Sequence, residues 1–524
     1  MSFLPSAAWI AAPLFVLGAF AAACSSSDTT GSTASTSSPG TGGAASTTSG
    51  SGGDTTSSST GGSSALGGPF RYGSNSGHRN ANWSNDKQAL LQSRAGGNGQ
   101  RILLPEWLFD QWGYDIEIKN NDFPSYEANG LTQNIAFVNG PIAAHSSAPP
   151  GLQQWELDHY PPKNLYAPVF LADHTINPEN YWAAFMFKTV SQYKTWVKVW
   201  EVWNEPDWVS DYNVTLTWGA QPPTAAQLPR WNGSIFDYVR LLRVSREAAQ
   251  AADPEARIAT GGLGYPSFAE ALLRYTDNPT DGSVTAEYPK KGGDYFDVLS
   301  FHYYPLYTPG NSDAAATGFI AERDAMAKVL SDAGVTGKAF TATETGAPHI
   351  DIKGAPSGAA YARSYLLKMM IEAQAKGMIG VDWFILSDGD NLTDAYSNMG
   401  LYEDVGNLAS PDDAKQTETG VAYATLGGLM RGARFDESAT KALSLPAGAQ
   451  GAAFQLASGE RAAVLWATAT SGETASAAVT IPASGEVVAH AWDWSRTKAT
   501  TKIAPVGGQA TLALTSSPQI FVIP

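Results

Sequence analysis

The stretch Lys198-Val-Trp-Glu-Val-Trp-Asn-Glu-Pro206 combines the pattern of a β-strand with a polar end. Valine and tryptophan are enriched in strands, so Lys198–Trp203 is predicted to be one, and a proline follows soon after. Asn204 and Glu205 then lie where the strand ends. In barrels of parallel strands the chemically active side chains project from these C-terminal ends, so comparable strand ends elsewhere in the chain indicate the other candidate site residues.

Seven other short apolar runs resemble this strand and alternate with helical patterns. They cover Phe70–Ser74, Arg101–Leu104, Asn134–Val138, Arg257–Gly261, Phe296–His302, Ala339–Glu344 and Gly380–Ile385. In the helical patterns apolar residues recur at steps of three and four residues, as in Ile235–Ala252, Phe319–Ala333 and Ala359–Lys376. This alternation predicts an α/β fold, a (β/α)8 TIM barrel over residues 69–432. An open doubly wound sheet is the alternative, but no glycine-rich phosphate turn follows the first strand.

The pattern changes in the last part of the chain. Short strands are predicted at Ala462–Ala469, Ala475–Ile481, Val487–Trp494, Thr500–Ile503 and Ala510–Leu514, with polar or glycine-bearing turns and no helix between them. Residues 433–524 are therefore predicted to form a small C-terminal antiparallel β-sandwich, an accessory domain.

The first 68 residues are predicted to be a signal and a linker. An apolar run from Ala7 to Ala23 ends in small residues immediately before Cys24. This resembles a bacterial lipoprotein signal, in which the cysteine becomes lipidated. Residues 25–68 are almost only Ser, Thr, Gly and Ala, so they are expected to form a disordered tether. The resemblance implies an exported protein that is anchored to a bacterial membrane through a lipid on Cys24 and faces the periplasm or the cell surface.

The composition narrows the classes of partner. The 524 residues include 49 acidic and 33 basic side chains, a formal net charge of −16. Such a surface repels nucleic acid and anionic lipid, because phosphate binding needs clustered Lys and Arg. A neutral substrate fits better, although acidity that serves only solubility explains the charge equally well. The single cysteine excludes an intramolecular disulfide. Seven scattered histidines without a His-x-His pair argue against a metal-dependent hydrolase, and neither a metal nor a cofactor is predicted.

The predicted strand ends supply two carboxylates. Glu205 ends the fourth strand, and Glu344 ends the seventh. Hydrolysis of a glycosidic bond needs one carboxyl group that protonates the leaving oxygen and a second that attacks the anomeric carbon. Strands four and seven lie on different sides of a barrel mouth, so these carboxylates can face each other across one sugar ring. Glu201, inside the strand, is predicted to be a buried structural ion-pair partner instead.

Four motifs together resemble the clan A glycoside hydrolases, a set of retaining enzymes that share the (β/α)8 barrel. They are Asn-Glu-Pro ending the fourth strand, His-x-Tyr ending the sixth, a glutamate ending the seventh and a tryptophan on the eighth. The resemblance covers residues 69–432 and selects no individual family. It implies a retaining enzyme that cleaves β-linked oligo- or polysaccharides, with Glu205 as the general acid/base and Glu344 as the nucleophile.

The same resemblance implies substrate-binding roles for five side chains. Asn204 is expected to hydrogen-bond the hydroxyl beside the anomeric carbon, His302 to be a hydrogen-bonding residue, and Tyr304 to hold the carboxylate of the nucleophile. Trp383 is expected to form the floor under the sugar, and Arg101 to correspond to the arginine found near the nucleophile in some families. Tryptophans in or near predicted loops are further candidates for lining a sugar-binding groove: Trp107, Trp112, Trp208 and Trp231.

Two alternatives remain open at the level of the sequence. A surface-tethered carbohydrate-binding protein on a non-catalytic barrel would use the same fold without cleavage. An inverting hydrolase would use two carboxyl groups with a wider gap, because a water molecule must fit between its base and the sugar.

Overall fold

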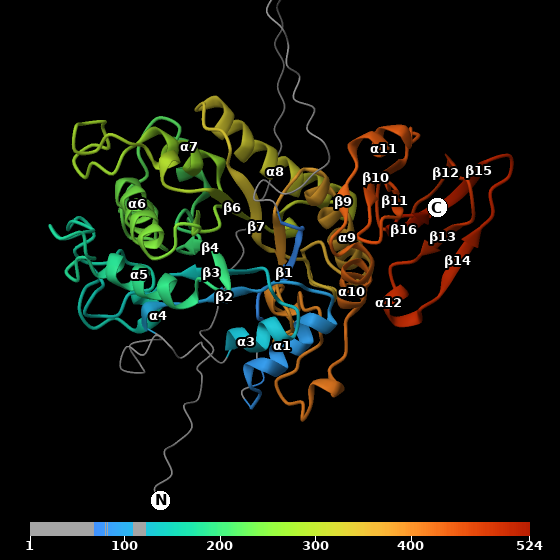
Figure 1. Ribbon diagram of the computed structural model, residues 1–524, viewed down its shortest axis with the longest axis horizontal. Coiled ribbons are helices and arrows are strands. Elements are labelled where there is room, and N and C mark those ends of the chain that lie inside the picture. The colour runs from blue at the N-terminus through green and yellow to red at the C-terminus, as the bar shows by residue number, and fades with distance from the viewer. Residues whose placement is uncertain (1–67, 79, 81, 108–121) are drawn as a thin grey trace, which may run out of the picture. The chain divides into compact units, whose positions relative to one another are not determined.

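The computed structural model describes residues 68–78, 80, 82–107 and 122–524 (Figure 1). The predicted signal, Cys24, residues 25–67 of the predicted linker and Trp112 lie outside the described residues. Along the described part of the chain, no helix has both the length and the apolar character needed to cross a membrane.

A sheet of eight parallel strands forms the barrel in Figure 1. The strands are β1 (Arg71–Ser74), β2 (Arg101–Leu103), β3 (Asn134–Val138), β4 (Val197–Val202), β5 (Arg257–Ala259), β6 (Val298–Tyr303), β7 (Ala339–Thr345) and β8 (Gly380–Trp383). Their order is β1-β8-β7-β6-β5-β4-β3-β2, and a parallel bridge between Asn75 and Arg101 joins the first strand to the second. The predicted (β/α)8 barrel is confirmed.

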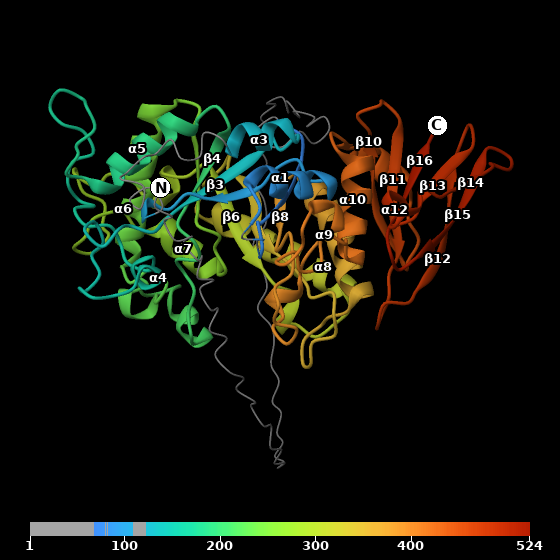
Figure 2. The same cartoon turned by 90° about the horizontal axis from the view of Figure 1, so that it is seen from below.

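Helices follow the strands and cover the barrel, as Figure 2 shows from below. They are α1 (Asn85–Arg94), α3 (Asp122–Ala128), α4 (Gln154–Leu157), α5 (Tyr181–Tyr193), α6 (Ile235–Ala252), α7 (Pro266–Arg274), α8 (Ser312–Asp332), α9 (Ala359–Ala375) and α10 (Glu418–Met430). Helix α6 begins at a reciprocal cap: Asp237 N donates to Ser234 Oγ at 3.2 Å, and Ser234 N donates to Asp237 Oδ2 at 2.8 Å. Helix α9 ends just before Gly377, whose φ of 72° suits a helix stop.

Helix α8 begins a full two turns earlier than the periodicity indicated. The apolar pattern predicts a start near Phe319, whereas the helix begins at Ser312. The Asn311 side chain caps this end by accepting a hydrogen bond from Ala314 N at 3.0 Å. The first turns are rich in alanine, which favours helix without producing an apolar stripe, so periodicity alone misses them.

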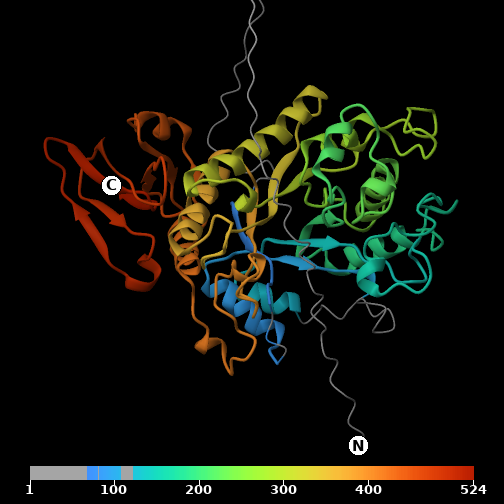
Figure 3. The same ribbon diagram turned by 180° about the vertical axis from the view of Figure 1, so that it is seen from behind.

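The C-terminal strands form two antiparallel layers, drawn in red in Figure 3. A six-stranded sheet has the order β14-β13-β16-β11-β10-β9, and β12 pairs with β15. The bounds are β9 (Arg434–Phe435), β10 (Ala449–Gln455), β11 (Arg461–Ala467), β12 (Ser476–Pro482), β13 (Val487–His490), β14 (Thr500–Ile503), β15 (Gln509–Thr515) and β16 (Gln519–Ile523), with short helices α11 (Glu437–Ala442) and α12 (Trp494–Thr497). A core of small and branched residues, including Leu465, Val479 and Leu512, fills the space between the layers. The predicted sandwich is confirmed.

Specific hydrogen bonds join the sandwich to the barrel helices. Asp313, in the first turn of α8, accepts from Trp466 Nε1 at 3.1 Å and from Ala469 N at 3.0 Å. The same carboxylate pairs with Lys368 of α9 at 2.9 Å, and the Lys368 side chain is 0% exposed. Because an unpaired buried ammonium is costly, this joint is a fixed part of the fold.

Candidate active site

The two predicted carboxylates meet at the C-terminal mouth of the barrel. Glu205 follows β4, Glu344 lies near the end of β7, and His302 lies near the end of β6. One ligand atom from each of these three side chains lies within 4.8 Å of the other two. The Glu205 and Glu344 side chains are 17% and 13% exposed, so they are held by protein but open to a ligand.

The turn after β4 aims Glu205 into the mouth. Trp203 and Glu205 have φ angles of 77° and 48°, which bend the chain out of the strand. Glu205 N donates to the carbonyl oxygen of Gly261 at 2.6 Å. A Cβ atom on Gly261 would lie 2.6 Å from the Val202 carbonyl oxygen, so only glycine permits this approach of the β5 end to the turn.

Two side chains, Arg101 and Tyr304, donate hydrogen bonds to the Glu344 carboxylate. Arg101 Nη1 donates to Oε1 at 2.5 Å, and the Tyr304 hydroxyl donates to Oε2 at 2.7 Å. Burial opposes ionisation, but the neighbouring His302 and Arg101 and the hydrogen bond from Tyr304 outweigh it and lower the pKa of Glu344. Burial lowers the pKa of His302 itself, so the permanent charge that keeps Glu344 ionised is that of Arg101.

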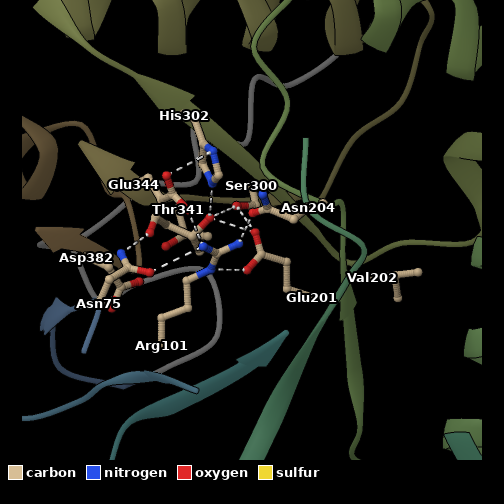
Figure 4. Close-up of polar contacts among 12 residues, drawn as sticks. Asn75, Arg101, Glu201, Val202, Asn204, Ser300, His302, Thr341, Glu344 and Asp382 are labelled. Carbon is tan, nitrogen blue, oxygen red and sulfur yellow. Dashed lines mark hydrogen bonds and ion pairs between the residues drawn. The ribbon is translucent and has the colours of Figure 1, made fainter. Parts of the chain in front are cut away.

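Arg101 organises the floor of the site. Its side chain is 1% exposed and donates through Nε to Glu201 Oε2 at 2.7 Å and through Nη2 to Asn204 Oδ1 at 2.8 Å (Figure 4). Its guanidinium also reaches Asn75 Oδ1 at 3.3 Å. Glu201 is thus a buried ion-pair partner, as the sequence predicts. The Asn204 oxygen is occupied, which leaves its amide nitrogen as the group available to a ligand.

Glu205 has two polar partners of its own. His302 Nδ1 lies 2.9 Å from Oε1, and Arg230 pairs with Oε2. Arg230 comes from the long loop between β4 and α6, and its guanidinium stacks on the Trp208 ring with 4.8 Å to the centroid. The sequence analysis missed Arg230, because nothing in the surrounding Leu-Pro-Arg-Trp segment indicates its partner; only the path of the loop brings it to Glu205.

A closed polar cluster lies beneath the pair. Glu201 Oε1 is 2.6 Å from Thr343 Oγ1 and 3.1 Å from Ser300 Oγ, and these two hydroxyl oxygens are 2.7 Å apart. Thr343 Oγ1 also lies 3.0 Å from His302 Nε2. Glu201, Ser300 and Thr343 are all 0% exposed, so these groups satisfy one another without solvent.

Trp383 lies away from the mouth. It is 0% exposed, its Nε1 donates to the Met399 carbonyl oxygen at 2.7 Å, and its ring packs near Tyr365. A fully buried indole offers no face to a sugar, so the expected floor under the sugar is not formed by Trp383. Successive side chains of a strand point to opposite faces, and the next residue, Phe384, turns toward the site: its ring centroid is 5.9 Å from that of Tyr304.

The loop tryptophans have different surroundings. Trp231 is 0% exposed and packs edge-on against Trp203 at 4.8 Å, so it is part of the core. Trp107 is half-buried beside Gly140. Trp208 lies under Arg230, next to Glu205, and is the only one of the three tryptophans within the described residues that borders this carboxylate.

Asp207 anchors the loop that carries Trp208. Its carboxylate accepts from Gly264 N at 2.8 Å and from Tyr265 N at 2.9 Å, which ties the loop after β4 to the loop after β5. Burial raises the pKa of Asp207 to about 7, against the effect of these two backbone donors.

The trio Glu205, His302 and Glu344 has the spacing of a possible metal site. However, the carboxylate oxygens already pair with the guanidinium groups of Arg101 and Arg230. Two fixed positive charges at this distance repel a further cation, so the electrostatics disfavour a metal ion bound by this trio.

No protein-family model matches the chain, and no curated protein matches it. Solved structures do. A family 39 glycoside hydrolase from the gut symbiont Bacteroides cellulosilyticus WH2 matches with a TM-score of 0.56 and 17% identity, over 86% of this chain and 80% of that one. A GH30 endoxylanase from Clostridium papyrosolvens C71 matches with a TM-score of 0.52 and 15% identity, over 87% and 97%. A family 51 α-L-arabinofuranosidase from Bifidobacterium longum matches with a TM-score of 0.50 and 13% identity, over 88% and 96%.

At these identities the likeness establishes the fold. The three matched proteins are glycoside hydrolases of different families, and the matched region extends over most of each chain. The chain therefore has the barrel fold of the clan A glycoside hydrolases, with no individual family among them selected.

Proposed function

We propose that the protein is a retaining glycoside hydrolase that cleaves β-linked oligo- or polysaccharides, with Glu205 as the acid/base and Glu344 as the nucleophile. One observation carries the proposal: oxygens of the two carboxyl groups approach within 4.8 Å of each other at an open barrel mouth. Retaining enzymes have carboxyl groups about 5 Å apart, whereas inverting enzymes need a wider gap for water. The spacing thus supports direct attack by a carboxylate.

The first half-reaction is glycosylation. Glu344 attacks the anomeric carbon, the glycosidic C–O bond breaks, and Glu205 transfers its proton to the departing oxygen. The products of this step are the released leaving group, whose oxygen is now a hydroxyl, and a glycosyl ester on Glu344. The low pKa of Glu344 keeps it ionised for this attack, because Arg101 stays charged.

The second half-reaction is hydrolysis of that ester. Glu205, now a carboxylate, takes a proton from water, the hydroxide oxygen bonds to the anomeric carbon, and the bond to Glu344 breaks. Both residues return to their starting protonation states, and the configuration at the anomeric carbon is inverted twice, hence retained.

Neighbouring side chains have distinct supporting roles. Asn204 donates its amide hydrogen to the hydroxyl beside the anomeric carbon, since Arg101 already occupies its oxygen. Phe384, rather than Trp383, supplies the apolar surface under the sugar, together with Tyr396 at a ring distance of 6.2 Å. His302 bonds Glu205, and Tyr304 orients Glu344.

The proposed substrate class rests on the net charge of the chain, and the proposed location rests on its N-terminal sequence. A net charge of −16 favours uncharged sugars over anionic polymers. The matched structures include both an endoxylanase and an α-L-arabinofuranosidase, so the shared barrel does not determine the linkage that is cleaved.

We propose further that the chain is exported and held at a bacterial membrane by a lipid on Cys24, with residues 25–68 as the tether.

The test is a pair of isosteric substitutions with a remote control. Glu344→Gln should lower turnover of aryl β-glycosides and β-linked polysaccharides by roughly 10⁴-fold or more, because a neutral amide cannot form the ester. Glu205→Gln should slow poor leaving groups far more than good ones. Glu437→Gln, in α11 of the sandwich, should behave as wild type.

Product stereochemistry completes the test. NMR of the first-formed sugar from a β-glycoside should show the β-anomer. A first-formed α-anomer would indicate an inverting enzyme. Oligosaccharide binding without cleavage, together with Glu344→Gln equal to wild type, would favour the carbohydrate-binding alternative.

A further inference from the structure

A buried chain of hydrogen bonds leads from Glu201 to the acid. Glu201 Oε1 lies 2.6 Å from Thr343 Oγ1, Thr343 Oγ1 lies 3.0 Å from His302 Nε2, and His302 Nδ1 lies 2.9 Å from Glu205 Oε1. Glu201 and Thr343 are 0% exposed, and the His302 side chain is 4% exposed. Because Glu201, Thr343 and His302 are nearly inaccessible to water, the donors among them must find their acceptors within this chain of hydrogen bonds.

The first link has a fixed direction. Arg101 Nε pairs with Glu201 at 2.7 Å, which favours the ionised carboxylate, and a carboxylate only accepts hydrogen bonds. At 2.6 Å from this oxygen, the Thr343 hydroxyl must therefore donate its single hydrogen to Glu201. Ser300, 2.7 Å from the Thr343 oxygen, can add a hydrogen but cannot accept that one.

The second link follows from the first. The Thr343 oxygen has only lone pairs left for His302, so Nε2 of the imidazole must carry a hydrogen. Burial lowers the pKa of His302, which favours the neutral ring. A neutral imidazole has one N–H, so Nδ1 is left with a bare lone pair. Gly262 fixes the ring from the other side: a Cβ atom there would lie 2.1 Å from Nε2.

The third link then determines where the catalytic proton rests. A bare Nδ1 at 2.9 Å from Glu205 Oε1 is attractive only if the carboxyl group supplies the hydrogen. We infer that Thr343 and Glu201 are positioning residues, which fix the Nε2–H tautomer of His302 and thereby keep Glu205 protonated between turnovers. The tautomer rests on the hydrogen-bond geometry together with the burial of the imidazole, whereas the claim that it stores a proton for catalysis rests on the proposed function.

Other charged groups face His302 and Glu205 and also influence whether Glu205 is protonated. Arg230 contacts the second oxygen of Glu205 and favours the carboxylate, and Glu344 Oε2 lies 3.7 Å from His302 Nδ1. Further charges act on His302 from neighbouring elements: Arg101, Glu201 and Asp207. The bare Nδ1 therefore favours a protonated Glu205, whereas Arg230 favours the carboxylate. If His302 instead carried its hydrogen on Nδ1, both His302 and Arg230 would favour an ionised Glu205.

The same arrangement serves both half-reactions. Once Glu205 has given its proton to the leaving oxygen, its carboxylate faces the lone pair of Nδ1, and the two repel each other. Taking a proton from the incoming water removes that repulsion. The contact thus assists the acid before cleavage and the base after it.

The direct test is the tautomer itself. Nitrogen-15 NMR of the full chain with labelled histidine distinguishes a protonated from a bare ring nitrogen, and His302→Gln assigns the signal. The wild type should show hydrogen on Nε2 and none on Nδ1. Thr343→Val, which removes the hydroxyl and keeps the shape, should move the hydrogen to Nδ1. Thr343→Ser should restore the wild-type pattern, and Ser300→Ala, which does not contact His302, should retain it.

Kinetics gives the functional readout. In Thr343→Val, the alkaline limb of the pH dependence of kcat should move to lower pH, because Glu205 loses its proton more readily. At the wild-type optimum this variant should be roughly tenfold slower on substrates with poor leaving groups, with little change on a dinitrophenyl glycoside that needs no acid. A merely structural defect would slow both substrates equally and leave the limb in place.

The two proposals can fail separately. A wild-type His302 with hydrogen on Nδ1, or a Thr343→Val protein with an unchanged tautomer, would overturn the inference without reference to any activity. Expected tautomers in a protein that cleaves no glycoside would support the hydrogen-bond chain and refute the hydrolase.

Discussion

Phe384 and Trp383 are neighbours in the chain, yet only Phe384 has a ring near the barrel mouth. Trp383 is 0% exposed, whereas Phe384 lies within ring contact of Tyr304 and Tyr396. Substitutions at these two positions should therefore affect substrate binding and stability separately.

Phe384→Ala should lower kcat/KM by about 10- to 100-fold, since the apolar surface under the sugar is lost, and should change the melting temperature little. Trp383→Phe should have the opposite profile: near-normal kinetics with a loss of about 1–3 kcal/mol of unfolding free energy. Steady-state kinetics and denaturant unfolding of both variants provide the comparison. Equal kinetic defects would place the sugar elsewhere.

Tyr304 has a more specific effect, on the acidic side of the pH profile. The lowered pKa of Glu344, the proposed nucleophile, means that this carboxylate is ionised above that pKa and loses its charge as the pH falls through it. Tyr304→Phe removes one donor to the carboxylate, so the pKa of Glu344 should rise. The acidic limb of kcat/KM should then move to higher pH, while the alkaline limb stays in place. An unmoved acidic limb would mean that Tyr304 does not control the ionisation of Glu344.

At the residue scale, local motifs predicted part of the site. Asn204, Glu205, His302, Tyr304 and Glu344 lie at strand ends that the sequence marks, and the structure brings them together. Arg230 and Phe384 were missed for different reasons. The position of Arg230 depends on the path of a long loop. The role of Phe384 depends on which face of β8 each side chain takes, and an apolar run such as Val-Asp-Trp-Phe-Ile does not show which of two adjacent residues points to the site.

At the scale of elements, the site depends on how closely the ends of β4 and β5 approach. Gly261 lets the backbone of the β5 end contact the turn that carries Glu205, through the 2.6 Å bond from Glu205 N. The strand bounds expected from the sequence were correct to within a few residues, as at β6, because a strand that is buried along almost its whole length appears as a short continuous apolar run. The start of α8 was not predicted, because its alanine-rich first turns produce none.

Gly261→Ala should displace the turn, because its Cβ atom would meet backbone atoms at 2.6 to 2.9 Å that cannot rotate away. A shift of about 1 Å in Glu205 can cost roughly 100-fold in rate. Gly264→Ala is the matched control in the same loop: its Cβ atom has nothing within 4 Å, and its N–H to Asp207 is retained. Activity and melting temperature of the two variants check the prediction, and equal behaviour would contradict it.

At the scale of the whole molecule, the barrel and the sandwich share a buried ion pair. The Asp313 carboxylate forms an ion pair with Lys368 of the barrel and accepts a hydrogen bond from Trp466 of the sandwich. The sequence predicted both domains from their different periodicities, but this joint could not be predicted, since it pairs residues that lie far apart in the chain and carry no common motif.

Asp313→Ala should destabilise the protein by about 3–5 kcal/mol, because Lys368 would remain as an uncompensated buried charge. Replacing both groups, as in Asp313→Ala with Lys368→Met, should recover much of this loss. Guanidinium denaturation of the single and double variants measures both effects. A single variant as stable as wild type would show that the joint contributes little.

The β-bridge between Asn75 and Arg101 closes the barrel between β1 and β2. The side chains of the same two residues contact the candidate active site. Arg101 binds Glu344, and Asn75 Nδ2 donates to the Thr343 carbonyl oxygen at 2.9 Å. A chain whose first and second strands have not yet joined therefore lacks the contact with Arg101 that keeps Glu344, the proposed nucleophile, ionised. If the proposed function is correct, activity during refolding should return only when β1 and β2 have paired, and a protein in which these strands stay unpaired should be inactive.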